Sequence, residues 1–364
     1  FNIHLNVDFP FNLTGVLYFP KIKPNVEPQR NKIQLFQKQV FVTDSVEGIV
    51  PDFLTLLHGV IDSPDIPLNV SRSYLQADGN VKKISSHITK KVADKLDEMF
   101  RKDREDFESK WNDMKIIIEY GMLTEDKFFD KAKKFAMYED TDGGLHTFEA
   151  YLETIKENQT DKDKKTVVLY ASNKNAQHSY IQQAKTKGYS VLLLDSPLTS
   201  HLLQKLEQEH ENTTFARVDS DLIDNLIKKD ETRVAKLSDK QKEELKTRLE
   251  SIVPKEKFTL KLEDMDSTEA PLMITVPEFM RRMKEMQMTG GGGMMGMGDF
   301  PEMYDLVVNA NHKLASKILD TDDEGARSEA VNQALDLAKL QQNLLHGEEL
   351  TAFISRSYAM LEEE

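Results

Sequence analysis

Residues 166–197 read TVVLYASNKNAQHSYIQQAKTKGYSVLLLDSP, and this stretch decides the fold class. The runs TVVLYA and YSVLLL are typical of buried strands, and the segment between them reads as a helix that Gly188 ends. A strand, a helix and a second strand predict a right-handed βαβ unit with a parallel strand pair. Asp195 follows the second strand, where ligands gather in α/β proteins. We favour an ordinary loop role for it, because Asp-Ser-Pro is common turn and cap chemistry.

The chain beyond this unit predicts a smaller α+β region that ends in two helices. Segment 226–246 is rich in lysine and acid and leads into it, and segments 257–262 and 272–276 alternate like strands. Each terminal helix has one apolar stripe, but the two are too short to bury both faces. We therefore expect a partner chain to complete a four-helix bundle, with packing inside one chain as the alternative. The predicted dimerisation residues are Val331, Leu335, Ala338, Leu345, Leu350, Phe353, Ile354, Tyr358 and Leu361.

Methionine is concentrated between the two predicted strands and the terminal helices. Eight of the 15 methionines lie between residues 273 and 297, partly at helical spacing, and glycines 290–293 interrupt them. The pattern predicts an amphipathic helix beside a mobile apolar loop. Unbranched, polarisable methionines suit a surface that accepts many apolar shapes, although they could equally fill a dimer core. The residues predicted to bind apolar partners are Phe279, Met280, Met283, Met286 and Met288.

Upstream of residue 160 the sequence mixes strands with long helices. Apolar residues recur every four positions from Ile84 to Phe100 and mark one buried face of a helix, while the charges between them form a solvated face. The helical pattern continues toward the phenylalanines near residue 130. A polar stretch, KENQTDKDKK at 156–165, separates this part from the βαβ unit.

A loop with stiff flanks precedes the long helix. Residues 62–76 read DSPDIPLNVSRSYLQ, and the two prolines hold its first half extended. Segment 45–61 is apolar enough for a buried helix behind it, so Asn69, Arg72 and Gln76 would lie on a loop held by a packed core. A guanidinium and an amide on one face suit a phosphate oxygen. The alternative is a surface arginine paired with a carboxylate.

Four segments carry a resemblance to a known family: FNLTGVLYFP at 11–20, QVFVTDSVEGIVPDFLTLLHGVIDS at 39–63, KGYSVLLLDSP at 187–197 and NANHKLASKILDTDDE at 309–324. In this order they resemble the middle and C-terminal domains of the HtpG chaperones, the bacterial members of the ninety-kilodalton heat-shock family. The resemblance implies an α/β and α+β fold, with a multi-layer α/β middle domain that contains the βαβ sub-unit. A smaller α+β dimerisation domain ending in two helices follows.

The resemblance also implies where the domains lie. The middle domain would span residues 1–228, divided into a large part, 1–160, and a small part, 161–228. The C-terminal dimerisation domain would span residues 229–364. Since the chain opens on a strand-like alternation and has no nucleotide-binding motif of the family's N-terminal domain, we expect a truncated protein.

The function implied by the resemblance is that of an ATP-dependent chaperone of the stress response. Its loop arginine, matching Arg72, would reach the γ-phosphate of ATP held with Mg in the absent N-terminal domain, and Asn69 and Gln76 would assist it. This fragment alone would bind no cofactor. Expected partners are non-native client proteins and a second copy of the chain, in the cytoplasm.

Composition excludes several classes of protein. The 364 residues carry a net charge of −14, which argues against a nucleic-acid partner. The chain contains no cysteine, which excludes disulfides and Cys-ligated zinc and is compatible with a reducing cytoplasm. Its apolar runs fall far short of the roughly 20 residues that span a bilayer. The glycine run lacks the Gly-Lys-Ser/Thr of a P-loop, and the histidines show no ligand spacing, so we predict no metal site.

Two rival classes fit part of the sequence. Another multidomain ATPase, such as a topoisomerase-like subunit, would present a lysine to the phosphate and a basic surface to DNA. A dimeric scaffold without client binding would need neither Arg72 nor exposed methionines. The arginine and the acidic charge favour the chaperone class.

Overall fold

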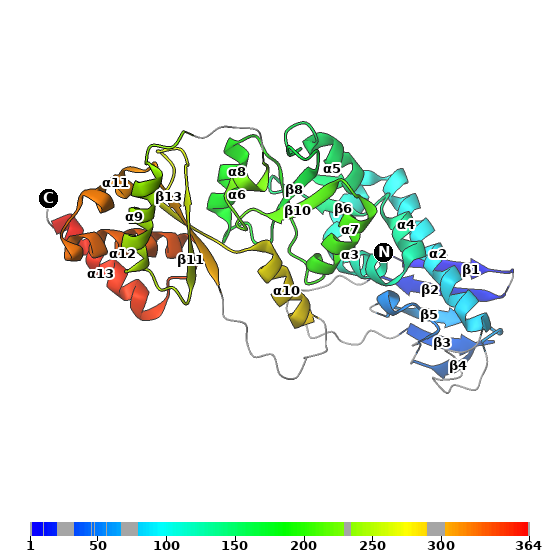
Figure 1. Cartoon of the computed structure of the whole chain (residues 1–364). Coiled ribbons are helices and arrows are strands. Elements are labelled where there is room, and N and C mark those ends of the chain that lie inside the picture. Colours follow the sequence, from blue (N-terminus) through cyan, green and yellow to red (C-terminus); the bar gives the residue numbers. More distant parts are fainter. Residues whose placement is uncertain are drawn as a thin grey trace. The chain divides into compact units, whose positions relative to one another are not determined.

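The computed structural model describes residues 2–9, 11–19, 33–44, 46, 48–55, 57–66, 79–228, 234–289 and 303–362 (Figure 1). The chain forms two compact units. Unit 1 comprises Phe1–Thr154 and Ser196–Glu209, and unit 2 comprises Ile155–Asp195 and His210–Glu364. Both combine helices with β-sheets, so the predicted mixed α/β fold is confirmed. The domain boundary proposed at residues 228 and 229 lies inside unit 2 and stays a prediction.

Unit 1 contains a five-stranded sheet with the order β1-β2-β5-β3-β4. Its strands are β1 (Asn2–Val7), β2 (Leu13–Tyr18), β3 (Ile33–Gln37), β4 (Val40–Thr43) and β5 (His58–Asp62). Strands β3 and β5 pair in parallel, and the other neighbours are antiparallel. Alternation along β1 turns Ile3, Leu5 and Val7 into the core. Gly15 allows β2 to approach β5 closely, since a Cβ there would lie 2.4 Å from the carbonyl oxygen of Val60.

The helices of unit 1 cover the core from apolar repeats. Helix α2 (Gly79–Lys102) buries Ile84, Ile88, Val92 and Leu96 completely, which confirms the helix predicted there. Asp103 caps the next helix by accepting a hydrogen bond from the Asp106 amide at 3.0 Å. The remaining elements are α3 (Arg104–Thr124), α4 (Asp126–Ala132), β6 (Met137–Glu139), β7 (Leu145–Thr147), α5 (Phe148–Ile155) and α7 (Thr199–Glu209).

The helix predicted for residues 45–61 is wrong. Of the residues described there, Asp52–Leu54 form one 3-10 turn, and the segment then enters strand β5 between β2 and β3. Gly48 has a φ of 82°, and Pro51 immediately precedes the turn, so both interrupt a helix. A short apolar run fits a central strand as well as a buried helix, and pairing on both sides decides for the strand.

Unit 2 begins with a three-stranded parallel sheet in the order β10-β8-β9. Its elements are β8 (Thr166–Ala171), α6 (His178–Thr186), β9 (Val191–Leu193), β10 (Thr213–Arg217) and α8 (Ile223–Leu226). The parallel pair predicted from residues 166–197 is therefore confirmed. Gly188, with a φ of 76°, follows the end of α6 as expected for a helix-terminating glycine.

A second three-stranded sheet, ordered β11-β13-β12, completes unit 2 together with five helices of the described residues. The elements are α9 (Asp239–Glu250), β11 (Phe258–Glu263), β12 (Leu272–Thr275), α10 (Glu278–Thr289), β13 (Tyr304–Asn309), α11 (Lys313–Asp320), α12 (Glu324–Gln341) and α13 (Gly347–Glu362). Met273 and Val307 of this sheet share a buried cluster with Tyr180 and Ile181 of α6. The Tyr180 hydroxyl also donates to the carbonyl oxygen of Ile274 at 2.8 Å, so the two sheets are joined by packing and by hydrogen bonding.

Candidate functional site

The predicted phosphate-binding residues Asn69, Arg72 and Gln76 lie outside the described residues. Both ends of their segment are described: β5 ends at Asp62, and α2 begins at Gly79. The sequence between these elements is the stretch in which we placed the loop. Its role in ATP hydrolysis stays a prediction.

The entry to that segment is held by side-chain hydrogen bonds. The Ser63 hydroxyl donates to the carbonyl oxygen of Asn12 at 2.7 Å, and the Asn12 amide donates to the Asp65 carboxylate at 2.7 Å. The Gln37 amide donates to the carbonyl oxygens of Pro64 at 3.2 Å and of Ile66 at 3.0 Å. These hydrogen bonds hold residues 63–66 against the sheet of unit 1.

Residues Glu278–Thr289 of the methionine-rich segment form helix α10, and a polar cluster anchors its first turn. The Glu278 carboxylate accepts hydrogen bonds from the Tyr170 hydroxyl at 2.8 Å, from Arg281 at 2.6 Å and from Arg282 at 2.7 Å. Arg281 also donates to the Tyr170 hydroxyl and places its guanidinium over the Tyr170 ring, 5.4 Å from the centroid. Arg282 donates to the carbonyl oxygen of Phe215 at 2.9 Å. The helix is therefore fastened to strands β8 and β10.

The electrostatics of this anchor favour one protonation state. Burial would raise the pKa of Glu278, but the charges and hydrogen bonds of Arg281 and Arg282 outweigh it and lower the pKa below its ordinary value. Burial, followed by the Glu278 charge, raises the pKa of Tyr170 far above its ordinary value. The cluster consequently holds a carboxylate, two guanidinium groups and a neutral phenol at pH 7.

Glu278→Gln should lower the free energy of unfolding by about 2 kcal/mol at pH 7, since it removes a charged acceptor from several hydrogen bonds. The folded-state pKa of Glu278 is lowered, so its contribution is present above the ordinary pKa of 4.5 and is lost as the pH falls through the folded pKa. The difference from the parent protein should therefore shrink in acid. Urea denaturation at several pH values measures it, with Glu149→Gln on the exposed face of α5 as the control. An equal loss at every pH would contradict the assigned charge state.

The exposed face of α10 begins directly after its anchor. Phe279 is 73% exposed, an unusual state for a large aromatic side chain, and Met280 and Met283 are half-buried. Met286 and Met288 belong to the same helix, but their side chains lie outside the described part of the chain. The first turns of the predicted amphipathic helix therefore carry one exposed aromatic and two half-buried methionine side chains next to the polar anchor.

The terminal helices α12 and α13 present apolar side chains to solvent. Helix α13 has no buried residue over its 16 residues. Polar contacts tie it to α12: Arg356 pairs with Asp336, and Gln333 donates to the Ser357 hydroxyl at 3.1 Å. The exposed apolar side chains of the two helices are Leu337, Leu340, Ile354, Tyr358, Met360 and Leu361. This set forms what we call the terminal apolar face.

The structure divides the nine predicted dimerisation residues. Ile354, Tyr358 and Leu361 belong to the terminal apolar face, and Leu350 and Phe353 are half-buried. The other four, in contrast, are at most 2% exposed and belong to the hydrophobic core of the chain itself. Because their own chain covers them, they cannot contact a partner directly, and they instead pack α12 against the core. These four are Val331, Leu335, Ala338 and Leu345.

Two further features of the described residues bear on function. No group of three or more histidine or acidic side chains in this part of the chain could hold a metal ion. None of its helices combines the length and apolarity that crossing a membrane requires.

These features define an α/β protein of two units with exposed apolar side chains on its terminal helices, and comparison with known proteins identifies its family. The profile of the Hsp90 protein family matches residues 1–363. The chain therefore belongs to this family. Because the match runs along nearly the whole chain, it includes the segment that carries Arg72.

Particular relatives are named as chaperones. The chaperone protein HtpG of Bacteroides thetaiotaomicron is 55% identical over 332 residues, which cover 90% of this chain and 49% of the relative. The chaperone protein HtpG of Porphyromonas gingivalis is 52% identical over 344 residues, covering 94% of this chain and 50% of the relative. That of Myxococcus xanthus is 26% identical over 358 residues. The chain spans about half the length of the curated relatives it matches.

Sequence reasoning missed the anchor of α10. Tyr170 and Glu278 are 108 residues apart, and neither belongs to a short motif with a known chemistry. One signal was available, because the PEFMRR run at 277–282 places an acid three and four residues before two arginines. That spacing predicts pairing within a helix. It does not reveal the tyrosine that completes the cluster.

Proposed function

We propose that this chain is the client-binding and dimerising part of an ATP-dependent HtpG-type chaperone of the cytoplasm. Its match to chaperone proteins along nearly its whole length carries the proposal. In the full-length protein, Arg72 would contact the γ-phosphate of an ATP held with Mg by another domain, assisted by Asn69 and Gln76. The fragment itself would bind no nucleotide.

Phosphoryl transfer needs little from such an arginine except position and charge. Charge spreads over the equatorial oxygens of the transferred group, and a planar guanidinium can contact two of them at once. An arginine supplied from a separate domain also links hydrolysis to domain closure. Hydrogen bonds that fix residues 63–66 to the sheet of unit 1 support this proposal, because they give the segment a rigid base.

Client binding is proposed for α10. An exposed phenylalanine with neighbouring methionines can accept apolar side chains of many shapes, because methionine is unbranched and adapts its rotamers. The Glu278–Arg281–Tyr170 cluster supports the proposal, because it attaches the helix to strand β8 through polar contacts and leaves its apolar side chains free of that task. Phe279 can then remain available to a client.

Phe279→Ser should weaken suppression of client aggregation by about threefold to tenfold, the effect of losing one exposed aromatic contact worth about 1 kcal/mol. Light scattering of a heat-denatured model protein, titrated with the chain, measures it. Phe9→Ser is the matched control, because Phe9 is 87% exposed in unit 1 and Phe279 is 73% exposed. Equal effects of both substitutions would remove α10 from the client site while leaving the family assignment intact.

A further inference from the structure

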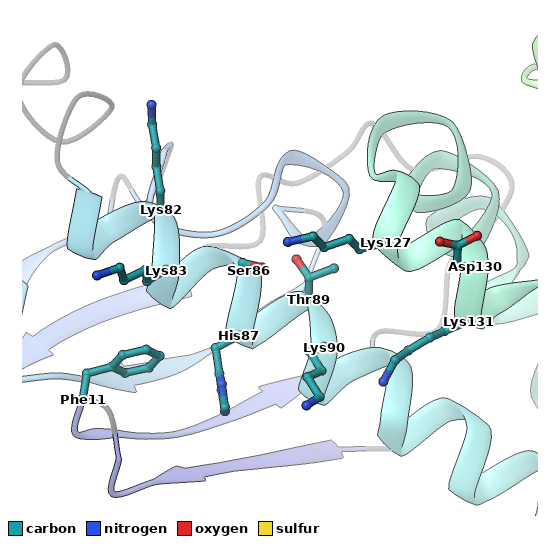
Figure 2. Close-up of a pocket in the computed structure, with 10 residues that line it drawn as sticks. All are labelled: Phe11, Lys82, Lys83, Ser86, His87, Thr89, Lys90, Lys127, Asp130 and Lys131. Carbon is teal, nitrogen blue, oxygen red and sulfur yellow. The ribbon is translucent and has the colours of Figure 1, made fainter.

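An open hollow of about 700 Å³ lies between α2 and α4 in unit 1, and its lining is strongly basic. Five lysines and a histidine line it, against one acid (Figure 2). Such an accumulation is notable in a chain whose net charge is −14. The lining lysines are Lys82, Lys83, Lys90, Lys127 and Lys131.

Among the described residues, most of these lysines have no acidic partner. Lys131 pairs with Asp94, but the other four form no ion pair with another described residue. The second half of the same helix behaves differently: Lys95 pairs with Glu98 at 3.1 Å, and Arg101 pairs with Asp97 at 2.9 Å. Unpaired charge on α2 is thus concentrated at the hollow.

The position of these charges along α2 is also unfavourable for the helix. Four lysines and no acid occur from residue 79 to residue 93, three of these lysines line the hollow, and the first turn of α2 has no acidic residue. The N-terminal end of a helix favours negative charge and disfavours positive charge. Lys82, at the end of the first turn of α2, therefore gains nothing from the helix dipole.

His87 and Phe11 form one wall of the hollow. Their rings meet edge to face, with centroids 5.3 Å apart. The His87 Nε2 atom is buried without a hydrogen-bond partner among the described residues. Burial and then the charges of Lys91 and Lys90 lower the pKa of His87, so the ring is neutral at pH 7. In Figure 2 the side chains of His87, Lys90 and Lys131 extend to the same side of the two helices.

We propose that this hollow binds acidic segments of non-native proteins, as a second client-contact surface distinct from α10. The proposal rests on the chaperone function proposed above. Lysine stems supply apolar contact to an extended peptide, while the ammonium groups pair with its carboxylates. Lysine ammonium groups are point charges without fixed geometry, so they suit carboxylates at variable positions along a chain.

The test is fluorescence anisotropy with a labelled peptide of alternating glutamate, phenylalanine and alanine, and with the same peptide carrying glutamine in place of glutamate. The variant Lys83→Gln, Lys90→Gln, Lys127→Gln should bind the acidic peptide about tenfold more weakly, or about 1.4 kcal/mol. Binding by the parent chain should fall steeply toward about 1 M salt, where the Debye length is about 3 Å. The glutamine peptide should bind weakly to both.

A matched control removes the same charge elsewhere. Lys95, Lys102 and Lys110 are paired with acids on α2 and α3, so their triple replacement by glutamine should change the affinity less than twofold. Equal weakening by both triple variants would show non-specific attraction and overturn the proposal. Binding of tripolyphosphate without binding of the peptide would also overturn it, because the hollow would then be a site for small polyanions.

Failure of this proposal can be told apart from failure of the chaperone function. If the acidic peptide does not bind while Phe279→Ser still weakens aggregation suppression, only the hollow assignment is wrong. If neither acidic nor neutral non-native chains interact with the protein, the proposed function fails as well.

Discussion

Arg72→Ala is expected to slow ATP hydrolysis by the full-length protein by roughly a hundredfold, with nucleotide affinity little changed. A guanidinium that reaches the transferred phosphoryl group interacts more strongly with the transition state than with bound ATP, because charge develops there during transfer. Its loss therefore lowers turnover rather than binding. The measurement is steady-state ATP turnover together with equilibrium binding of a labelled nucleotide.

Two comparisons make the arginine prediction specific. Arg101→Ala removes an exposed arginine that is paired with Asp97 on α2, and it should leave turnover unchanged. Arg72→Lys keeps the charge but loses the planar two-pronged contact, so its rate should lie between those of the parent and Arg72→Ala. A parent-like rate for Arg72→Ala would assign the residue a structural role. Loss of nucleotide binding would point to a ground-state contact instead.

Ile354→Asp combined with Leu361→Asp should weaken dimerisation by at least about a thousandfold. Each protomer would lose two apolar contacts, and burying such a side chain contributes about 1.5–3 kcal/mol. Ile354 is 44% exposed and Leu361 is 74% exposed, so the substitutions should leave the fold of one chain intact. Sedimentation equilibrium over a concentration series gives the dissociation constant, and circular dichroism checks the helices.

The dimer prediction has a matched control elsewhere on the chain. Phe9→Asp combined with Val234→Asp changes two side chains that are 87% and 80% exposed but lie outside the terminal apolar face. This variant should remain dimeric. If the parent chain sediments as a monomer at high concentration, the dimerisation proposal is wrong. If both double variants weaken the dimer equally, the interface does not lie on α12 and α13.

The terminal helices illustrate what periodicity can and cannot predict. The apolar spacing of α12 correctly indicated a buried face, yet Val331 and Leu335 meet the core of their own chain. An apolar stripe indicates only that another surface covers that face of the helix. The covering surface can belong to a partner or to the same chain. The exposed Leu337 and Leu340 of the same helix point to a partner only once the covered face is known.

Strand β5 lies in a segment for which the sequence predicted a helix. The sequence around it has no consistent period of two or of 3.6, and its apolar content alone favoured a helix. Hydrogen bonding to β2 and β3 on both sides settles its conformation. Strands β2 and β3 lie earlier in the chain, and no local sequence signal near β5 predicts that it pairs with them.

Local, repeated signals in the sequence predict several elements correctly. Helix α2, the parallel strands β8 and β9 and the end of α6 near Gly188 all follow from short-range periodicity and backbone preference. The folded chain is needed to show which apolar faces remain uncovered, how Tyr170 meets Glu278, and where unpaired lysines of the described residues gather around one hollow. These depend on contacts between segments far apart in the chain. Burial and charge pairing are set by the neighbours that folding brings together, and the local sequence does not record these neighbours.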